Sequence, residues 1–311
     1  MNYFVRKLCF LLILAVCAGI VAGLLWQDRQ QRQSESQRIQ LVAQQAAPYE
    51  QELQKIYQEV QVRKNGTNSD SATAGAVICF VPGGAEDLSR VEAIRADRGF
   101  TPVIALDCDL GEQTLRQIAR QASQAGFGLM LMAGVFDQND LATADALKEE
   151  LIGSGVSQPA FLLRRNDDTP GNRELLKAQG FENLFRYSET LADEVQGNLR
   201  MLPYGFIRSQ SSGSSLASQL IAAHSSVALM FDLRTGELSD DAIAAFLKEL
   251  DGMTAQGQLE YRDVSNAFSV LAQKAAAEQQ ALAELEAYLQ AQDARMAELE
   301  ELIQQIYTQG G

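Results

Sequence analysis

Four patterns of apolar and polar positions follow one another along the chain, and the first predicts a membrane segment. Arg6 and Lys7 precede residues 8–26, a run of nineteen residues without a charged side chain that ends at Trp26. This run is long enough to span a bilayer, and the basic residues before it predict a cytoplasmic N-terminus. It is longer than the apolar core of a cleaved signal peptide. We therefore predict an uncleaved signal anchor at residues 1–26 of a single-pass membrane protein whose bulk is extracytoplasmic. The alternative, lipidation at Cys17, conflicts with the bulk of Val16.

The second pattern is a helical seam in residues 27–64. Apolar residues recur there at alternating spacings of three and four, at Ile39, Val42, Ala46, Tyr49, Leu53, Ile56 and Val60. This spacing predicts a coiled-coil stalk. Pro48 implies either a kink or a helix that restarts with proline in its first turn. The small polar residues 65–75 after the stalk predict a flexible linker.

In the third pattern, residues 76–263, short apolar runs alternate with amphipathic stretches. The runs are AVICFV (76–81), TPVIAL (101–106), FGLMLM (127–132), PAFLLR (159–164), ENLFRY (182–187), LRMLPY (199–204), SVALMF (226–231) and QLEYRD (258–263). Most lack polar–apolar alternation, as strands buried on both faces of a parallel sheet do. The repeat predicts an α/β domain that forms a (β/α) barrel, and an open doubly wound sheet is the alternative.

The fourth pattern, residues 264–311, predicts one long C-terminal coiled-coil helix. Its seam runs through Leu271, Ala275, Leu282, Leu285, Leu289, Met296, Leu299, Ile303 and Ile306. A helix of this length extends roughly 65 Å at 1.5 Å per residue, too far to lie against one small barrel. We expect a coiled-coil protein partner or self-association. An antiparallel partner such as the near-neutral stalk suits the acidic residues 278–301 better than parallel self-association.

Charge and cysteine content limit the functions further. The formal net charge is −14, so a nucleic-acid partner is not expected. Cys79 and Cys108 lie in or beside apolar runs, where they could form a disulfide or stay as buried thiols.

Residues 76–263 resemble the polysaccharide deacetylase family, whose fold is a distorted, TIM-like (β/α) barrel. The resemblance rests on the succession AVICFVPGGAEDLSRVEAIRADRGFTPVIALD, IARQASQAGFGLMLMAG, FLLRRNDDTPGNRELLKAQGF and VALMFDLRTGELSDDAIAAFLKELDGM. The stretch RRNDDTPGNRELLKAQGF is similar to the family's arginine-containing loop with its following helix and Gly-aromatic turn. The resemblance implies a divalent metal, a carboxylate base and a general acid.

The positions that match the family's catalytic motifs carry other residues. Val81 and Pro82 stand where the family has two aspartates, Met132 where it has a metal-binding histidine, and Phe231 where it has the general-acid histidine. None of these side chains can bind the metal or transfer a proton. Of the motif residues, only the loop arginine, Arg164 or Arg165, and Asp232 remain. We therefore expect neither catalytic residues nor metal nor cofactor. The single histidine, His224, precedes the seventh strand and is interpreted as a surface or capping residue.

Sites in barrels form at the carboxyl ends of the strands, and a mixed-charge rim is predicted there. Its members are Asp107, Asp109, Asp137, Arg164, Arg165, Asp168, Tyr187, Asp232 and Arg234. The rim has three interpretations: Arg–Asp pairs that hold the mouth together, a binding groove for a sugar or peptide, and a metal-free hydrolase that uses two carboxylates.

The sequence as a whole favours a membrane-anchored pseudo-enzyme, a cell-envelope scaffold or a module that binds a cell-wall glycan or a protein. The alternative is an active carbohydrate deacetylase or glycoside hydrolase with a rearranged site. In a third interpretation the helical arms carry the function and the barrel is a spacer.

Overall fold

The computed structural model describes residues 3–66, 73–133, 136–153 and 158–310, and in α1 it describes the side chains of residues 22–63. Most of the predicted linker, residues 65–75, lies outside the described residues. The chain divides into two compact units, Met1–Asn68 with Gln280–Gly311, and Ser69–Gln279.

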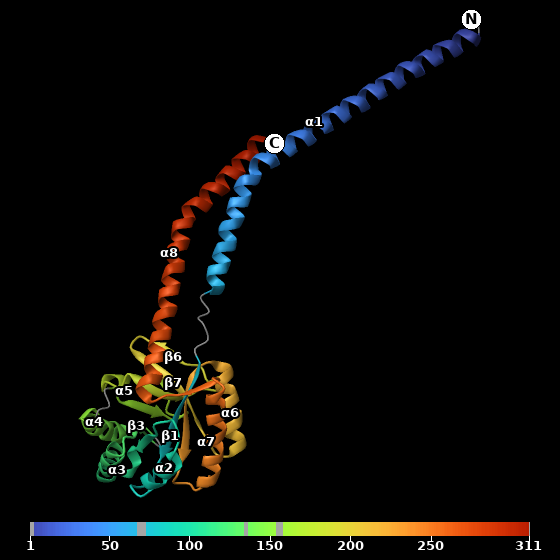
Figure 1. The fold of residues 1–311 in the computed structure, drawn as a ribbon. Coiled ribbons are helices and arrows are strands. Elements are labelled where there is room, and N and C mark those ends of the chain that lie inside the picture. The colour runs from blue at the N-terminus through green and yellow to red at the C-terminus, as the bar shows by residue number, and fades with distance from the viewer. Residues whose placement is uncertain (1–2, 67–72, 134–135, 154–157, 311) are drawn as a thin grey trace. The chain divides into compact units, whose positions relative to one another are not determined.

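The unit Ser69–Gln279 is a closed barrel of parallel strands, shown in Figure 1. Within the described residues seven strands form the ring: β1 (Ala74–Val81), β2 (Val103–Asp107), β3 (Gly128–Met132), β4 (Ala160–Leu163), β5 (Asn183–Tyr187), β7 (Leu199–Phe206) and β8 (Ser226–Asp232). The pairs Cys79↔Val103 and Phe80↔Ile104 between β1 and β2 close it. The predicted barrel is confirmed, and the alternative of an open sheet is wrong.

The eighth predicted strand does not join this ring. β9 (Leu259–Tyr261) pairs only with residues 74–76 of β1, while β2 pairs with β1 nearer its carboxyl end. The short strand β6 (Glu194–Gln196) pairs antiparallel with β7, so the connection from β5 to β7 contains a strand where the predicted repeat has a helix.

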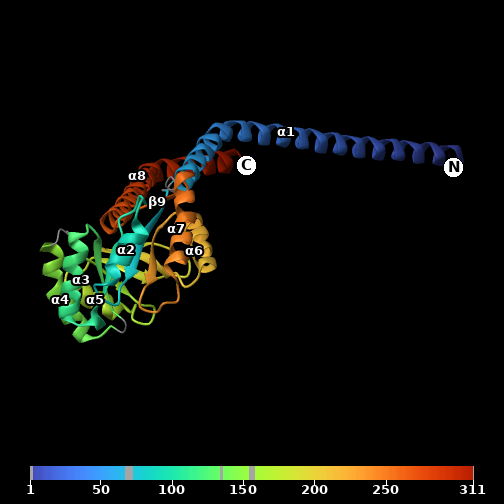
Figure 2. The same cartoon turned by 60° about the horizontal axis from the view of Figure 1, so that its bottom comes forward.

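Helices follow the other ring strands and cover the barrel, as Figures 1 and 2 show. They are α2 (Asp87–Arg95), α3 (Glu112–Gln124), preceded by the 3-10 turn η1 (Cys108–Leu110), α4 (Gln138–Gly153), α5 (Pro170–Ala178), α6 (Gln210–Ala223) and α7 (Asp240–Ala255). Thr169, Ser209 and Ser239 begin three of them as N-caps, because each side-chain oxygen accepts a hydrogen bond from a backbone N–H in the first turn.

Alternation along each ring strand separates two apolar layers. In β1, Ile78 and Phe80 pack outward against the helices, while Val77, Cys79 and Val81 fill the barrel interior. This alternation was invisible in the sequence because both faces of the strand are buried. The interior also holds Met130 and Met132 of β3, together with Val264, Ala267, Phe268 and Leu271 from the first turns of α8 (Val264–Gly310).

The other unit contains an antiparallel pair of helices, formed by α1 (Tyr3–Gly66) and the carboxyl-terminal part of α8. Ile56, Val60 and Leu299 are buried in their seam. Tyr307 donates a hydrogen bond to Glu50 at 2.9 Å, and Tyr288 donates one to Glu59 at 2.6 Å. The residue numbers of the two hydrogen-bonded pairs rise along α1 and fall along α8, so the two helices are antiparallel. Pro48 lies inside α1, so the helix does not restart there.

The predicted membrane anchor requires a correction. In the part of the chain that the structure describes, no helix is long and apolar enough to cross a membrane. A span needs about 20 consecutive apolar residues, and the described part of α1 soon turns polar, with Arg32 paired to Asp28 at 3.1 Å. Most side chains of the predicted span, residues 8–26, lie outside the described ones. The finding overturns the prediction of a single-pass membrane protein with a cytoplasmic N-terminus and an extracytoplasmic bulk.

Candidate functional site

The candidate site is a cavity of about 800 Å³ at the carboxyl ends of β4, β5, β7 and β8. We call it the mouth groove and define it by its lining residues, which are Arg164, Arg165, Asn166, Asp167, Tyr187, Tyr204, Gly205, Phe206, Ile207, Arg208, Asp232, Thr235, Glu237 and Leu238. Its volume is within the range of small-molecule binding sites.

Aromatic side chains line the groove on β5 and β7. The rings of Tyr187 and Tyr204 lie 6.5 Å apart, and those of Tyr204 and Phe206 lie 5.7 Å apart, both pairs in edge-to-face arrangement. Tyr204 is buried, and burial raises the pKa of its hydroxyl to about 12. Tyr187 is 37% exposed, and because Arg165 lies over one face of its ring, the remaining exposed part of the ring is what a ligand can contact.

Beside the groove, Arg234 binds two carboxylates from different strands. Its Nε and Nη2 donate to the two oxygens of Asp232 at 2.9 and 2.8 Å, and its Nη1 donates to Asp107 Oδ2 at 2.5 Å. Burial raises the pKa of Asp232, but the hydrogen bonds and charge of Arg234 outweigh it, so the pKa is lowered overall. The carboxylate of Asp232 thus stays ionised and hydrogen-bonded to an arginine.

Three arginines face the groove itself. Arg165 lies over the ring of Tyr187, with its guanidinium carbon 4.7 Å from the ring centroid, and pairs with Glu189 at 2.8 Å. The Nη2 of Arg164 lies 3.8 Å from Asp107 Oδ2, beyond hydrogen-bond distance, and its buried Nε has no partner. The guanidinium of Arg208 makes no hydrogen bond or ion pair with any other described residue.

The remaining predicted rim residues serve local structure. Asp137 accepts hydrogen bonds from the backbone N–H groups of Asn139 and Asp140 at the start of α4. Asp168 accepts from Arg173 Nε at 2.6 Å. Asp109 donates its backbone N–H to Asp107. Of the nine predicted rim residues, Arg164, Arg165, Tyr187 and Asp232 line the groove, while Asp107 and Arg234 lie in the adjoining ion-pair cluster.

The positions that the resemblance assigns to catalysis are buried and apolar. Val81 and Met132 belong to the barrel interior, and Phe231 points outward and stacks on Phe80 with centroids 5.3 Å apart. Pro82 is buried as well. These residues do not fit a divalent metal. Within the described part of the chain, no group of three or more His, Cys, Asp or Glu side chains could hold one.

The remaining candidate groups lie away from the groove. His224 is the C-cap residue of α6, with a φ of 48°. Cys79 and Cys108 are both free and buried, so they do not form the disulfide left open by the sequence. Burial raises the pKa of the Cys108 thiol to about 12, which keeps it protonated and unreactive at neutral pH.

Sequence reasoning missed part of the groove. The run LRMLPY predicts that the strand ends at Tyr204, whereas β7 continues to Phe206, and the groove is lined as far as Arg208. Gly205 interrupts the apolar run, because glycine weakens a strand interior, and Phe206 and Ile207 after it are the apolar residues that indicate the continuation.

Comparisons with known proteins give weak similarities only. No protein-family model and no curated protein matches the chain. Its structure is similar to that of a protein described as a polysaccharide deacetylase from Mycobacterium smegmatis, with 13% identity and a TM-score of 0.48 over 66% of this chain and 92% of that one. It is also similar to (S)-3-O-geranylgeranylglyceryl phosphate synthase from Thermoplasma acidophilum, with 12% identity and a TM-score of 0.31 over 62% of this chain and 98% of that one.

Proposed function

We propose that the barrel is a degenerate deacetylase-like domain that binds a carbohydrate in the mouth groove without chemically changing it. The observation that carries this proposal is the composition of the groove, in which the exposed ring of Tyr187 lies beside hydrogen-bonding side chains. Sugar rings have apolar C–H faces that pack on aromatic rings, and hydroxyl edges that need polar partners. The similarity of residues 76–263 to polysaccharide deacetylases supports a sugar over a peptide.

The ion pairs of Asp232 and Asp107 argue against these two carboxylates as the general acid of an active hydrolase. A glycosidase needs one carboxyl group that is protonated at working pH and can act as the general acid. Asp232 has a lowered pKa and accepts two hydrogen bonds from Arg234. Its hydrogen bonds from Arg234 favour the ionised form and make it unsuited to that role, and Asp107 likewise accepts a hydrogen bond from Arg234.

The proposal is tested by measuring, with calorimetry, the affinity of the full chain for a panel of neutral and acidic oligosaccharides. Tyr187→Ala removes the exposed ring, and we expect it to weaken binding roughly tenfold, on the scale of 1 to 1.5 kcal/mol for an aromatic contact. Tyr57→Ala is the matched control, since Tyr57 is an exposed tyrosine of α1 outside the groove.

Two results would contradict the proposal. One is the absence of binding to every oligosaccharide in the panel. The other is the release of acetate from acetylated sugars, or the cleavage of a glycosidic bond, by the purified chain, since either would make the barrel an enzyme.

A further inference from the structure

The hydrogen bonds and ion pairs of the arginines that line the mouth groove indicate which chemical group a ligand of the groove carries. Arg208 lies two residues beyond the end of β7 and is exposed, and its guanidinium has no carboxylate partner among the described residues. Its backbone N–H donates to Ser212 Oγ at 3.3 Å, which holds this part of the chain against the first turn of α6. That turn contains no acidic residue. The charge of Arg208 is therefore available to a ligand.

Arg164 is also incompletely paired. Its nearest carboxylate, Asp107, is already occupied, because Oδ2 accepts from Arg234 and Oδ1 accepts from the backbone N–H of Asp109. The 3.8 Å separation between Arg164 Nη2 and Asp107 leaves the Arg164 guanidinium without a direct hydrogen bond to it. A guanidinium has five N–H donors, and its planar fork matches a carboxylate or a phosphate.

The carboxylates of the groove limit how much negative charge the ligand can carry. Asp232 is balanced by Arg234, but Asp167 and Glu237 also line the groove, and no basic side chain pairs with either of them in the described structure. They would repel a polyanion. They would also accept hydrogen bonds from sugar hydroxyls.

Building on the proposed carbohydrate-binding function, we infer that the ligand is a sugar with a single anionic group, a carboxylate or a phosphate, bound by Arg164 and Arg208. The neutral part of the sugar lies against Tyr187, and its hydroxyls donate to Asp167 and Glu237. This assignment uses the incompletely paired Arg164, the unpaired charge of Arg208 and the carboxylates of Asp167 and Glu237 at the same time, which neither a neutral sugar nor a polyanion does.

Calorimetry with matched sugars tests the inference on the full chain. The probes are cello-, xylo- and chitotetraose, the same sugars with one terminal uronic acid or one terminal phosphate, and inorganic phosphate. We expect one acidic form to bind about tenfold more tightly than its neutral counterpart, and the form that does so distinguishes carboxylate from phosphate. Added salt should weaken this preference.

Variants that remove the charge of Arg164 or Arg208 test whether these arginines cause the tighter binding of the acidic sugar. Arg164→Gln and Arg208→Gln should each lower the affinity for the acidic sugar about tenfold and leave that for the neutral sugar unchanged. Arg38→Gln, on the exposed surface of α1, is the matched control and should change neither. Because Arg208 is exposed, its variant tests the inference even if Arg164→Gln fails to fold.

The outcomes separate this inference from the proposed function. Equal affinity for neutral and acidic sugars, or a preference that survives both arginine variants, overturns the inference and leaves the carbohydrate function standing. Binding of inorganic phosphate that depends on Arg208, without binding of any sugar, supports an anion site and overturns the carbohydrate function. Binding of none of the probes overturns both.

Discussion

At the scale of single residues, Arg234 is the cation that compensates the carboxylates of Asp107 and Asp232 at the mouth of the barrel. Asp107 is only 1% exposed, and a buried carboxylate is costly unless a cation and hydrogen bonds compensate for it. Arg234 binds both this carboxylate and that of Asp232, which lie 125 positions apart in the sequence, at the ends of β2 and β8. One guanidinium thus donates hydrogen bonds to carboxylates on two ring strands and compensates part of their charge.

We expect Arg234→Met to lower the free energy of unfolding by about 2 kcal/mol, because it leaves the Asp107 carboxylate without its close counter-charge. Arg164 remains nearby and moderates the loss. Urea denaturation measures the change, and Arg90→Met serves as the control. Arg90 also pairs with two aspartates, but its side chain is 37% exposed, and the buried Asp87 keeps the hydrogen bond from the backbone N–H of Gly83 at 2.8 Å, so we expect a smaller loss of about 1 kcal/mol.

The double variant Arg234→Met with Asp107→Asn removes the unpaired charge and should regain part of the stability. If Arg234→Met were as stable as the original chain, the ion pairs of Arg234 with Asp107 and Asp232 would not contribute to the stability of the barrel.

At the scale of elements, α6 and α7 pack closely because a glycine faces a phenylalanine. A methyl group added at Gly213 would lie 2.7 Å from the ring of Phe246, which is fully buried. Gly252, inside α7, has no atom within 4 Å of the same added methyl. The contact with Phe246 therefore requires a small residue at position 213, whereas no neighbouring atom requires one at position 252.

Substitution by alanine should change the stability differently at Gly213 and at Gly252. Gly213→Ala overpacks the contact between α6 and α7, and we expect a loss of about 1 to 3 kcal/mol. Gly252→Ala should be neutral or raise stability by up to about 1 kcal/mol, because alanine is the better helix former and has space there. Thermal denaturation followed by circular dichroism measures both. A stabilising effect of Gly213→Ala would refute the close contact.

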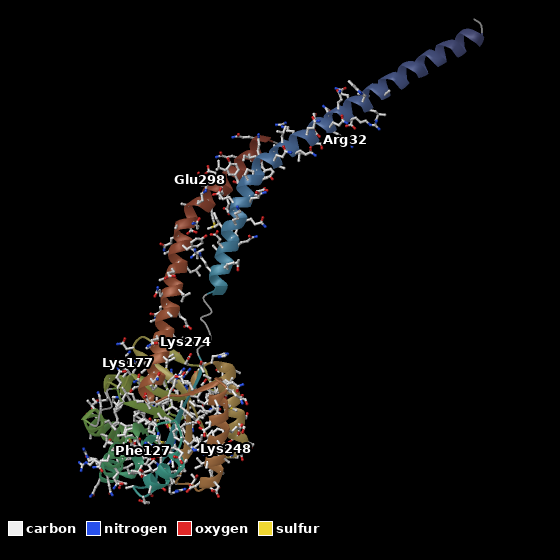
Figure 3. All side chains as sticks on the ribbon, in the orientation of Figure 1. Arg32, Phe127, Lys177, Lys248, Lys274 and Glu298 are labelled. Carbon is white, nitrogen blue, oxygen red and sulfur yellow. The ribbon has the colours of Figure 1, made fainter. Side chains whose placement is uncertain are left out.

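At the scale of the whole molecule, the chain forms two compact units, and α8 contributes residues to both. Its first turns lie in the barrel unit, and residues 280–310 lie in the helix-pair unit. Figure 3 shows side chains of Glu298 in the second segment and Lys274 in the first. In the helix pair, hydrogen bonds such as Arg295 Nε to Glu52 at 2.9 Å join α8 to α1 around a narrow apolar seam.

Leu299→Ala tests whether this seam holds the helix pair together. Leu299 is fully buried, and we expect about 2 to 3 kcal/mol of local destabilisation from the cavity. In hydrogen–deuterium exchange, peptides around Ile56 and Leu299 should then exchange faster, while those from β1 and β8 should not change. Leu282→Ala, at a position that is 54% exposed, is the matched control. Equal effects of the two substitutions would contradict a seam at Leu299.

Much of the fold was predictable because it depends on local pattern. Every ring strand coincides within two residues at each end with an apolar run, since strands buried on both faces have to be apolar throughout. The extent of the candidate site was less predictable. Tyr187 and the two loop arginines lie at or directly after the ends of apolar runs, whereas Arg208 lies beyond a strand that is longer than its apolar run.

The sequence by itself determined the seven ring strands, most of the helices and the apolar character of the stretch GFGLMLMAG, residues 126–134, because each depends on side chains that are close together in the chain. The tertiary structure alone decided that seven strands close the ring and that β9 stays outside it, because pairing joins residues distant along the chain. It also decided that Arg234 pairs with Asp107 and Asp232, while the guanidinium of Arg208 has no partner among the residues that the structure describes. Ion pairs depend on distances in space, which neither composition nor periodicity contains.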